Sequence, residues 1–142
     1  MSDSDVTIEV LLGVKQHSAA RRLGLAHSIE AGLPVKALDR LAESVAPGDA
    51  RFKFKLIPKA TLERRRKSKR FTAEEGDRLA RIAKVYSFGL NIYRDPEKVR
   101  EFLRRPHEML DNQAPLDVAL ATGAGADAVI NLLGRAAYSG GV

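Results

Sequence analysis

The side chains that most often carry enzyme chemistry are sparse in this sequence and are not grouped in a catalytic pattern. The three histidines, His17, His27 and His107, do not combine with one another or with acidic residues in a metal-binding arrangement. No serine or threonine is paired with a histidine that would activate it as a nucleophile. The sequence therefore predicts no metal site, no cofactor and no enzyme.

Two other segments resemble sites but have simpler explanations. Glu74, Glu75 and Asp77 form an acidic cluster, yet the first turn of a helix attracts acidic residues through its dipole. Residues 123–128, GAGADA, resemble the start of a phosphate-binding loop but lack the third glycine and the preceding strand. We therefore interpret both segments as the starts of helices.

The remaining candidate is a local cluster of positive charge. Residues 51–70, RFKFKLIPKATLERRRKSKR, contain ten basic residues and one acidic residue, Glu63. The rest of the chain has fourteen basic and seventeen acidic residues, so the net charge of +6 comes from this one patch. A single basic patch on a slightly acidic protein is typical of a binding site for a polyanion. A solvated helix face and a polybasic targeting signal are the alternatives.

The length and composition of the chain limit the kind of protein that carries this basic patch. The chain has 142 residues, of which 44% are apolar, enough for one domain or two small ones with a buried interior. It has no cysteine, which excludes disulfides and thiolate metal sites. The first ten residues are acidic, unlike a secretory signal, and no apolar run is long enough to span a bilayer. We expect a cytoplasmic protein with no membrane partner.

The spacing of apolar residues predicts helices almost throughout, so the expected fold class is all-α. The clearest helix start is Thr72, because Glu75 follows three residues later and completes a capping box. Residues 1–16 show no clear period and are expected to be a mobile arm. The predicted helices cover residues 18–32, 34–45, 58–70, 72–94, 95–103 and 125–138, and residues 115–120 form a short turn.

Residues 51–57, RFKFKLI, are the ambiguous segment. They alternate as a strand would, with Phe52, Phe54 and Leu56 on one side. A single strand has nothing to pair with in an otherwise helical chain, so we predict a short helix instead.

This short helix and the helix that Pro58 opens have the size and order of a helix-turn-helix, whose second helix lies in the major groove. Counting about 100° per residue from Leu62 leaves Thr61, Arg64 and Lys67 exposed, whereas the stem of Arg66 should lie along the core. Thr61 and Arg64 would read base edges. Lys67, Lys69 and Arg70 would neutralise phosphates. The DNA-binding residues predicted in this way are Lys59, Thr61, Arg64, Lys67 and Lys69.

Four short motifs occur in a fixed order along the chain. They are Thr-Leu-x-Arg-Arg at 61–65, Asp-Arg-Leu-x-Arg at 77–81, Pro-Leu-Asp at 115–117 and Leu-Leu-Gly-Arg at 132–135. With these motifs, residues 20–142 resemble the Xre/MbcA/ParS family of antitoxins. The chain departs from the family in two places: Phe102 replaces the tryptophan of a frequent Trp-Leu pair, and the ending AAYSGGV replaces an acidic Ile-Glu-x-Gly segment.

The resemblance implies a type II antitoxin with an Xre-like helix-turn-helix over residues 17–71 and a small helical lobe over residues 72–142 for dimerisation and toxin binding. The implied partners are operator DNA, through which the antitoxin represses its own operon, and a RES-domain toxin that consumes NAD or transfers ADP-ribose from it. A homodimer that forms a hetero-oligomer with the toxin is also expected. The family motif adds Arg65 to the predicted DNA-binding residues.

The C-terminal tail has two interpretations. From its residues alone, YSGGV is typical of a frayed chain end. The resemblance implies instead that the C-terminal part covers the toxin's NAD site, with Tyr138 as the anchor. The toxin-binding residues predicted in this way are Leu133, Arg135, Tyr138, Ser139, Gly140, Gly141 and Val142. The alternative function is a stand-alone dimeric helix-turn-helix regulator, in which the second lobe serves only for dimerisation.

Overall fold

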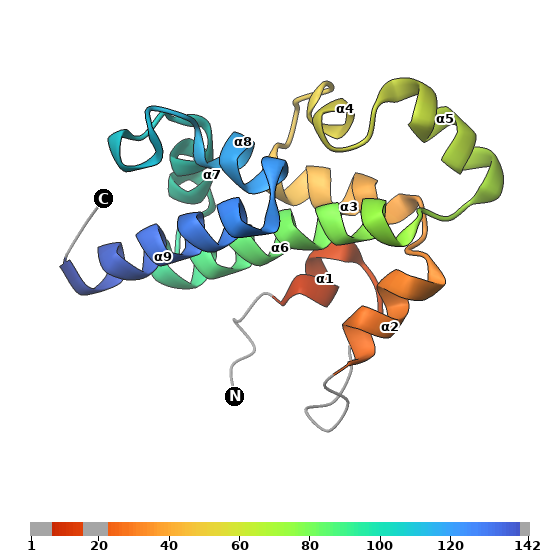
Figure 1. The fold of residues 1–142 in the computed structure, drawn as a ribbon, viewed down its shortest axis with the longest axis horizontal. Helices are drawn as coiled ribbons and strands as arrows, with labels where there is room; N and C mark the ends of the chain where they lie inside the picture. Colours follow the sequence, from red (N-terminus) through yellow and green to blue (C-terminus); the bar gives the residue numbers. More distant parts are fainter. Residues whose placement is uncertain (1–6, 16–22, 140–142) are drawn as a thin grey trace. The chain divides into compact units, whose positions relative to one another are not determined.

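The computed structural model describes residues 7–15 and 23–139, and these residues form helices joined by short connections (Figure 1). No strand is formed within these two ranges, so the all-α prediction is confirmed. In chain order the helices are α1 (Ile8–Leu12), α2 (Gly24–Ala31), α3 (Lys36–Val45), α4 (Phe52–Leu56), α5 (Lys59–Ser68), α6 (Ala73–Tyr93), α7 (Pro96–Arg104), the 3₁₀ helix η1 (Glu108–Leu110), α8 (Pro115–Ala121) and α9 (Gly123–Ser139).

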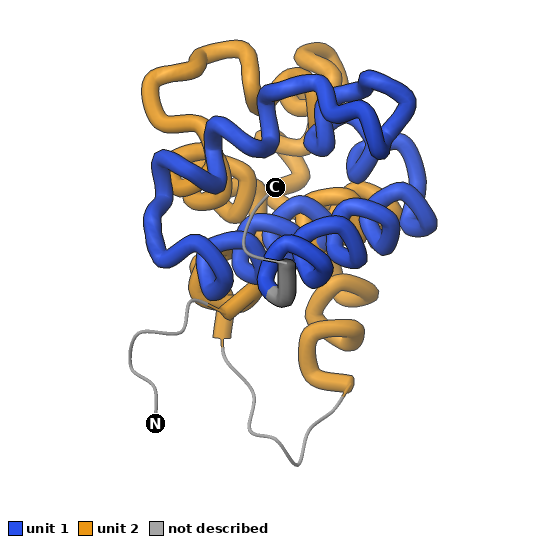
Figure 2. Tube along the Cα trace, turned by 90° about the vertical axis from the view of Figure 1, so that its left-hand side faces the viewer, with its two compact units in different colours: residues 1–6, 81–142 blue, residues 7–80 orange. Residues whose placement is uncertain are grey.

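The chain divides into two compact units, one of Thr7–Ala80 and one that contains Arg81–Val142 (Figure 2). The sequence suggested a boundary between residues 71 and 72, whereas the division lies inside α6. The first turns of α6 belong to the N-terminal unit because Glu75 binds Arg65 of α5 and Arg78 binds the carbonyl of Leu56 at the end of α4.

The ambiguous segment at residues 51–57 forms the short helix that was predicted. In α4, Phe52 and Leu56 are four residues apart and share one face, where they are 1% and 0% exposed. Phe54 points elsewhere and is 40% exposed. A strand would have put all three on one side, so this pattern of burial follows from the helical period.

The prediction of a mobile arm is wrong for residues 7–15, while residues 1–6 and 16 lie outside the described part. Thr7 caps α1, because its hydroxyl accepts a hydrogen bond from the Val10 N–H at 3.2 Å. Gly13 ends α1 in the left-handed region with φ +66°. Leu11 and Leu12 are buried, and α1 packs on α3. Five residues rarely form a stable helix alone, so this packing supplies the order.

The C-terminal unit is built around the packing of α8 on α9. Gly125 allows the two helices to come close, since a Cβ atom there would lie 2.1 Å from the Val118 carbonyl oxygen. Gly89 of α6 similarly makes room for Val99 of α7, which would be 3.0 Å from an added Cβ atom. The buried apolar residues of this unit after α6 are Val99, Phe102, Leu103, Leu110, Leu116, Ala119, Ala126, Val129, Leu132, Leu133 and Ala136.

The packing of α1 can be tested with two substitutions in the same helix. Leu12 is fully buried and Val10 is 47% exposed. Leu12→Ala should lower the free energy of unfolding by about 2–4 kcal/mol, because it leaves a cavity. Val10→Ala should change it by no more than about 0.5 kcal/mol. Chemical denaturation followed by circular dichroism measures both, and equal small effects would mean that α1 does not dock.

Candidate nucleic-acid interface

The connection between α4 and α5 is a tight corner with no glycine. Ile57 ends α4 in an extended conformation and is fully buried, and Pro58 precedes the first residue of α5. The Arg78 guanidinium donates a 2.7 Å hydrogen bond to the Leu56 carbonyl, one of the groups that the end of α4 leaves unpaired. The corner is therefore fixed by a buried apolar side chain and by a polar contact from α6.

Helix α5 offers most of its surface to solvent. Leu62 is its one buried residue, and Thr61 and Arg65 are half-buried. The exposed basic residues of α5 and the turn after it are Lys59, Arg64, Arg66, Lys67, Lys69 and Arg70. Thr61, Arg64 and Lys67 share a face as predicted, since they are three residues apart. The Arg64 Nη2 atom lies 3.4 Å from the Thr61 hydroxyl oxygen. Arg64 and Lys67 thus form a row of positive charge on a solvent-exposed face of α5.

Arg65 has a different position from the other basic residues of α5. Its Nε and Nη2 atoms donate to the two carboxylate oxygens of Glu75 at 2.7 and 3.0 Å. The Arg65 side chain is only 24% exposed and that of Glu75 only 10%. Arg65 is thus held inside the unit, where its ion pair joins α5 to the start of α6.

Glu75 also completes the predicted capping box at the start of α6. Its carboxylate accepts from the Thr72 N–H at 2.9 Å, and its own N–H donates to the Thr72 hydroxyl at 3.2 Å. The hydrogen bonds from Arg65 lower the pKa of Glu75, and those from Thr72 add to this effect, while burial opposes it. Within the acidic cluster of Glu74, Glu75 and Asp77, Glu75 therefore serves to stabilise the fold. The described residues contain no group of three His, Cys, Asp or Glu side chains suited to a metal ion.

Two basic residues near α5 behave differently from what the sequence indicated. Arg66, whose stem was expected to lie along the core, is exposed, and Arg65 turns inward in its place. Arg70 donates from Nη1 to the Gly32 carbonyl at 2.8 Å and so joins the turn after α5 to the end of α2. Helical spacing does not predict which of Arg65 and Arg66 turns inward, because they follow Leu62 by three and four residues and both lie near its face. The contact with Glu75 shows that it is Arg65.

The predicted toxin-binding residues lie on α9 and beyond its end. Leu133 is fully buried, and it would lie 3.7 Å from a Cβ atom added at Gly89 of α6. The structure thus places Leu133 in the core, where it supports α9 and is not offered to a partner. Arg135 is exposed. The side chains of Tyr138 and Ser139, and residues 140–142, lie outside the described part.

Two family models match the chain and together cover both units. An antitoxin Xre-like helix-turn-helix domain matches residues 24–84, and an antitoxin Xre/MbcA/ParS C-terminal toxin-binding domain matches residues 89–138. The chain belongs to the Xre/MbcA/ParS-type antitoxins. A comparison with curated proteins finds no match. In this antitoxin the helix-turn-helix model spans α2 to α5 and part of α6, and the toxin-binding model spans α7 to α9.

The comparisons confirm the predicted order of an N-terminal helix-turn-helix followed by a helical toxin-binding lobe. They support an antitoxin that binds DNA and a toxin. The family is one of regulatory proteins, which agrees with the lack of a catalytic pattern in the sequence. No helix in the described ranges is long and apolar enough to cross a membrane.

The contribution of the Glu75 charge to the stability of the fold can be tested by varying the pH. Because the pKa of Glu75 is lowered in the folded antitoxin, the carboxylate stabilises the fold at neutral pH, and this contribution is lost as the pH falls from the ordinary pKa through the lowered one. Glu75→Gln should reduce the free energy of unfolding by roughly 1–2 kcal/mol at neutral pH. The difference from the wild type should shrink in acid, as measured by thermal unfolding across pH.

Glu74→Gln is the matched control for this experiment. It removes the same charge one residue earlier, where the side chain is exposed. Exposed charges contribute little to stability, so this variant should unfold like the wild type at neutral pH. If Glu75→Gln and Glu74→Gln have the same pH profile, the contact with Arg65 does not stabilise the fold.

Proposed function

We propose that this antitoxin belongs to a type II system, in which it neutralises a RES-domain toxin that consumes NAD or ADP-ribosylates a target, and represses its own operon by binding operator DNA. The observation that supports this most directly is the pairing of an exposed basic helix, α5, inside a matched helix-turn-helix domain with a matched toxin-binding domain on the same chain. A protein that carries both can couple toxin binding to transcription.

The DNA-binding part of the proposal assigns distinct roles to the residues of α5. Arg64 is exposed and Thr61 is half-buried on the row that would enter the major groove, where a bidentate arginine recognises guanine. Lys59, Lys67 and Lys69 are exposed and would neutralise phosphates of the backbone. Arg65 acts indirectly, because its guanidinium is bound to Glu75 and fixes the angle of α5.

The toxin-binding part of the proposal rests on α9 and the tail that follows it. The packed inner face of α9, which includes Leu133, gives the helix a fixed place on the C-terminal unit. Residues 138–142, YSGGV, offer an aromatic side chain for an apolar pocket and glycines that let the backbone pass close to a wall. We propose that this segment and Arg135 cover the mouth of the toxin's NAD site, with most of the affinity coming from the helices.

We also propose a homodimer, since one small helix-turn-helix makes few base contacts and two half-sites raise specificity. Most apolar residues of the long helix α6 are buried within the chain, and Phe88 is the one large apolar residue of α6 that is exposed, at 37%. The surface that α6 offers to a second copy is therefore narrow and centred on Phe88.

A stand-alone dimeric regulator is the alternative function, and the match to a toxin-binding domain favours the antitoxin.

The proposed reading face of α5 can be tested with duplex DNA from the region upstream of the gene. Arg64→Ala should weaken binding by about 1–3 kcal/mol and relax base preference, because it removes a bidentate base contact. Lys67→Ala should flatten the dependence of log affinity on log salt by about one unit. Lys84→Ala, an exposed lysine in the C-terminal unit, serves as the control. Unchanged binding by both α5 variants would make the basic row a solvated helix face.

The proposed role of the tail can be tested by deleting residues 138–142. Because the packed helices supply most of the affinity and the tail enters the active site, the shortened antitoxin should still co-elute with a co-expressed RES-domain toxin on a sizing column. The toxin in that complex should regain NAD turnover. Asn131→Ala, an exposed change on α9 that leaves the tail intact, is the control. A shortened antitoxin that inhibits fully would show that inhibition comes from elsewhere on the chain.

A further inference from the structure

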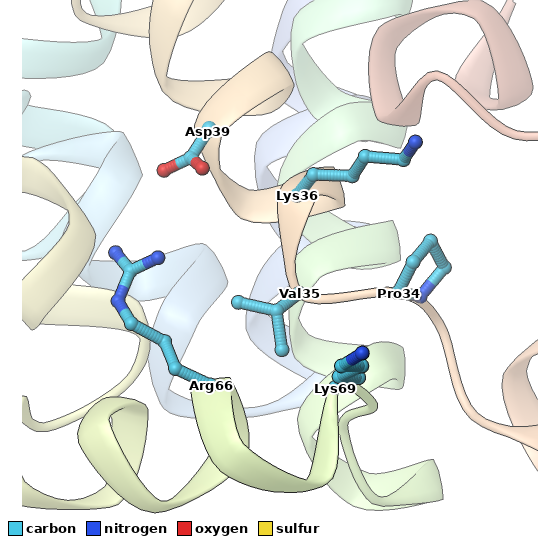
Figure 3. Close-up of a pocket in the computed structure, with 6 residues that line it drawn as sticks. All are labelled: Pro34, Val35, Lys36, Asp39, Arg66 and Lys69. Atoms are coloured by element: carbon cyan, nitrogen blue, oxygen red, sulfur yellow. The ribbon is translucent and has the colours of Figure 1, made fainter.

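Two surface features have no role in the proposed function: a recess between α3 and α5, and an exposed methionine between α7 and α8. The recess is lined by Pro34, Val35, Lys36, Asp39, Arg66 and Lys69. Figure 3 shows that the side chains of Lys36 and Arg66 point apart, and Asp39 is already paired with Lys53 at 2.7 Å. The charges around the recess therefore do not converge on one ligand. The methionine, Met109, lies within the residues that match the toxin-binding domain.

Met109 is a large apolar side chain that the fold leaves in solvent. It is 60% exposed, whereas its neighbour Leu110 is 9% exposed. No other large apolar residue is exposed among residues 89–137, the part of the matched toxin-binding domain whose side chains are described. A single exposed apolar residue is common on protein surfaces, so exposure alone does not indicate a partner. The loop that carries Met109 supplies the further evidence.

Met109 lies in a tightly hydrogen-bonded loop of residues 107–113, the η1 loop, which contains the 3₁₀ helix. The His107 N–H donates to the Gln113 carbonyl at 3.1 Å, and the His107 carbonyl accepts from the Leu110 N–H at 2.9 Å. The Met109 N–H donates to the Nδ1 atom of His107 at 3.1 Å. The backbone that carries the exposed side chain is therefore fixed by hydrogen bonds from both ends of the loop.

Two adjacent residues of the η1 loop have a left-handed backbone conformation. Asp111 has a φ of 55° and Asn112 has a φ of 62°. Residues other than glycine rarely adopt a positive φ, although Asp and Asn tolerate it better than most. Such conformations persist where surrounding contacts hold them, and they concentrate at active and binding sites. The η1 loop thus has the kind of backbone that is found at functional surfaces.

The η1 loop is also joined to the core of its unit. The Leu110 side chain is buried, and the ring of His107 meets the ring of Phe102 edge-on, with 6.4 Å between the ring centroids. Phe102 lies on the buried face of α7. The position of the Met109 backbone is therefore set before a partner arrives, which reduces the entropy lost on binding. The unbranched side chain of methionine can then adapt to an irregular apolar pocket.

We propose that Met109 is an anchor for the toxin and fills an apolar pocket on the toxin surface outside the NAD site. This inference rests on the proposed function and adds a second contact to that of α9 and the tail. The η1 loop lies inside residues 89–138, which match a toxin-binding domain. In Figure 1 the connection between α7 and α8 lies towards the same end of the unit as the last turns of α9, which precede the tail. A toxin that receives the tail is therefore the partner within reach of Met109.

The charged residues near Met109 fit the rim of such a contact. Glu108 and Asp111 are exposed on either side of it in the sequence. The Arg105 side chain is 72% exposed, and its Nη2 atom lies 3.6 Å from the Glu101 carboxylate. An apolar anchor inside a polar rim is the usual arrangement of an interface hot spot, where the anchor contributes most of the affinity and the rim excludes water. The matching pocket on the toxin should be apolar at its base and polar at its edge.

The test measures the affinity of antitoxin variants for an immobilised RES-domain toxin by surface plasmon resonance. Met109→Ala should bind about tenfold or more weakly, because it removes the anchor. Met109→Leu should keep most of the affinity, since it conserves an apolar side chain of similar volume. Met109→Lys should bind most weakly, because it would bury an unpaired charge. Val10→Ala, which shortens an exposed apolar side chain of the other unit, is the control.

The three Met109 variants should unfold like the wild type, because the side chain is exposed. At saturating concentration Met109→Ala should still stop NAD turnover, whereas the antitoxin without residues 138–142 should bind with little loss and fail to inhibit. If Met109→Ala and Met109→Lys bind the toxin as tightly as an inhibitory wild type does, the anchor is wrong and the proposed function stands. The anchor is also wrong if Met109→Lys breaks a homodimer but leaves toxin affinity unchanged, since a second copy then covers the loop. If the wild type does not bind the toxin, both proposals fail.

Discussion

The carboxylate of Glu75 is the contact on which the orientation of the basic helix depends. It is the one charged residue found buried in the described ranges, and it accepts hydrogen bonds from two atoms of Arg65 and from the Thr72 N–H. A buried charge is costly unless its hydrogen bonds are met, and here they are. The same carboxylate therefore begins α6 and fixes α5 against it. Removing either partner would leave the other charge half-buried and unpaired.

This polar contact matters because α5 receives little support from the hydrophobic effect. Leu62 is its only buried residue, whereas α3 buries five. A helix that is polar nearly all round gains little from packing and needs specific contacts to hold its angle. The Arg65–Glu75 pair supplies such a contact in the last turns of α5, and the Lys69 carbonyl, which accepts from the Val35 N–H, supplies another directly after the helix. The weak packing leaves the other cations exposed and available to a polyanion.

Local sequence rules predicted most helices of this fold, but they did not predict the features that depend on tertiary packing. The capping box at Thr72 and Glu75 follows from local spacing and is found. The short helix at residues 52–56 was predicted against its alternating pattern, because a single strand would have no partner, and it is found as well. Helix α1 was missed because five residues with two buried leucines carry no readable period, and its order comes from packing on α3. Leu133 was expected on a binding surface because the family motif gives residue identity but not the face of the helix.

The two adjacent arginines of the Thr-Leu-x-Arg-Arg motif show how such a motif combines two tasks. Arg64 is exposed, whereas Arg65 points back to Glu75, because neighbouring residues on a helix lie about 100° apart. One arginine therefore faces solvent while the next one joins α5 to α6. The basic residues of α5 do not form a uniform patch. They comprise an outward row, an inward clamp and, around the end of the helix, the two exposed cations that line the recess beside α3. A count of charges in the sequence cannot separate these three positions, since they are set by what lies opposite each side chain.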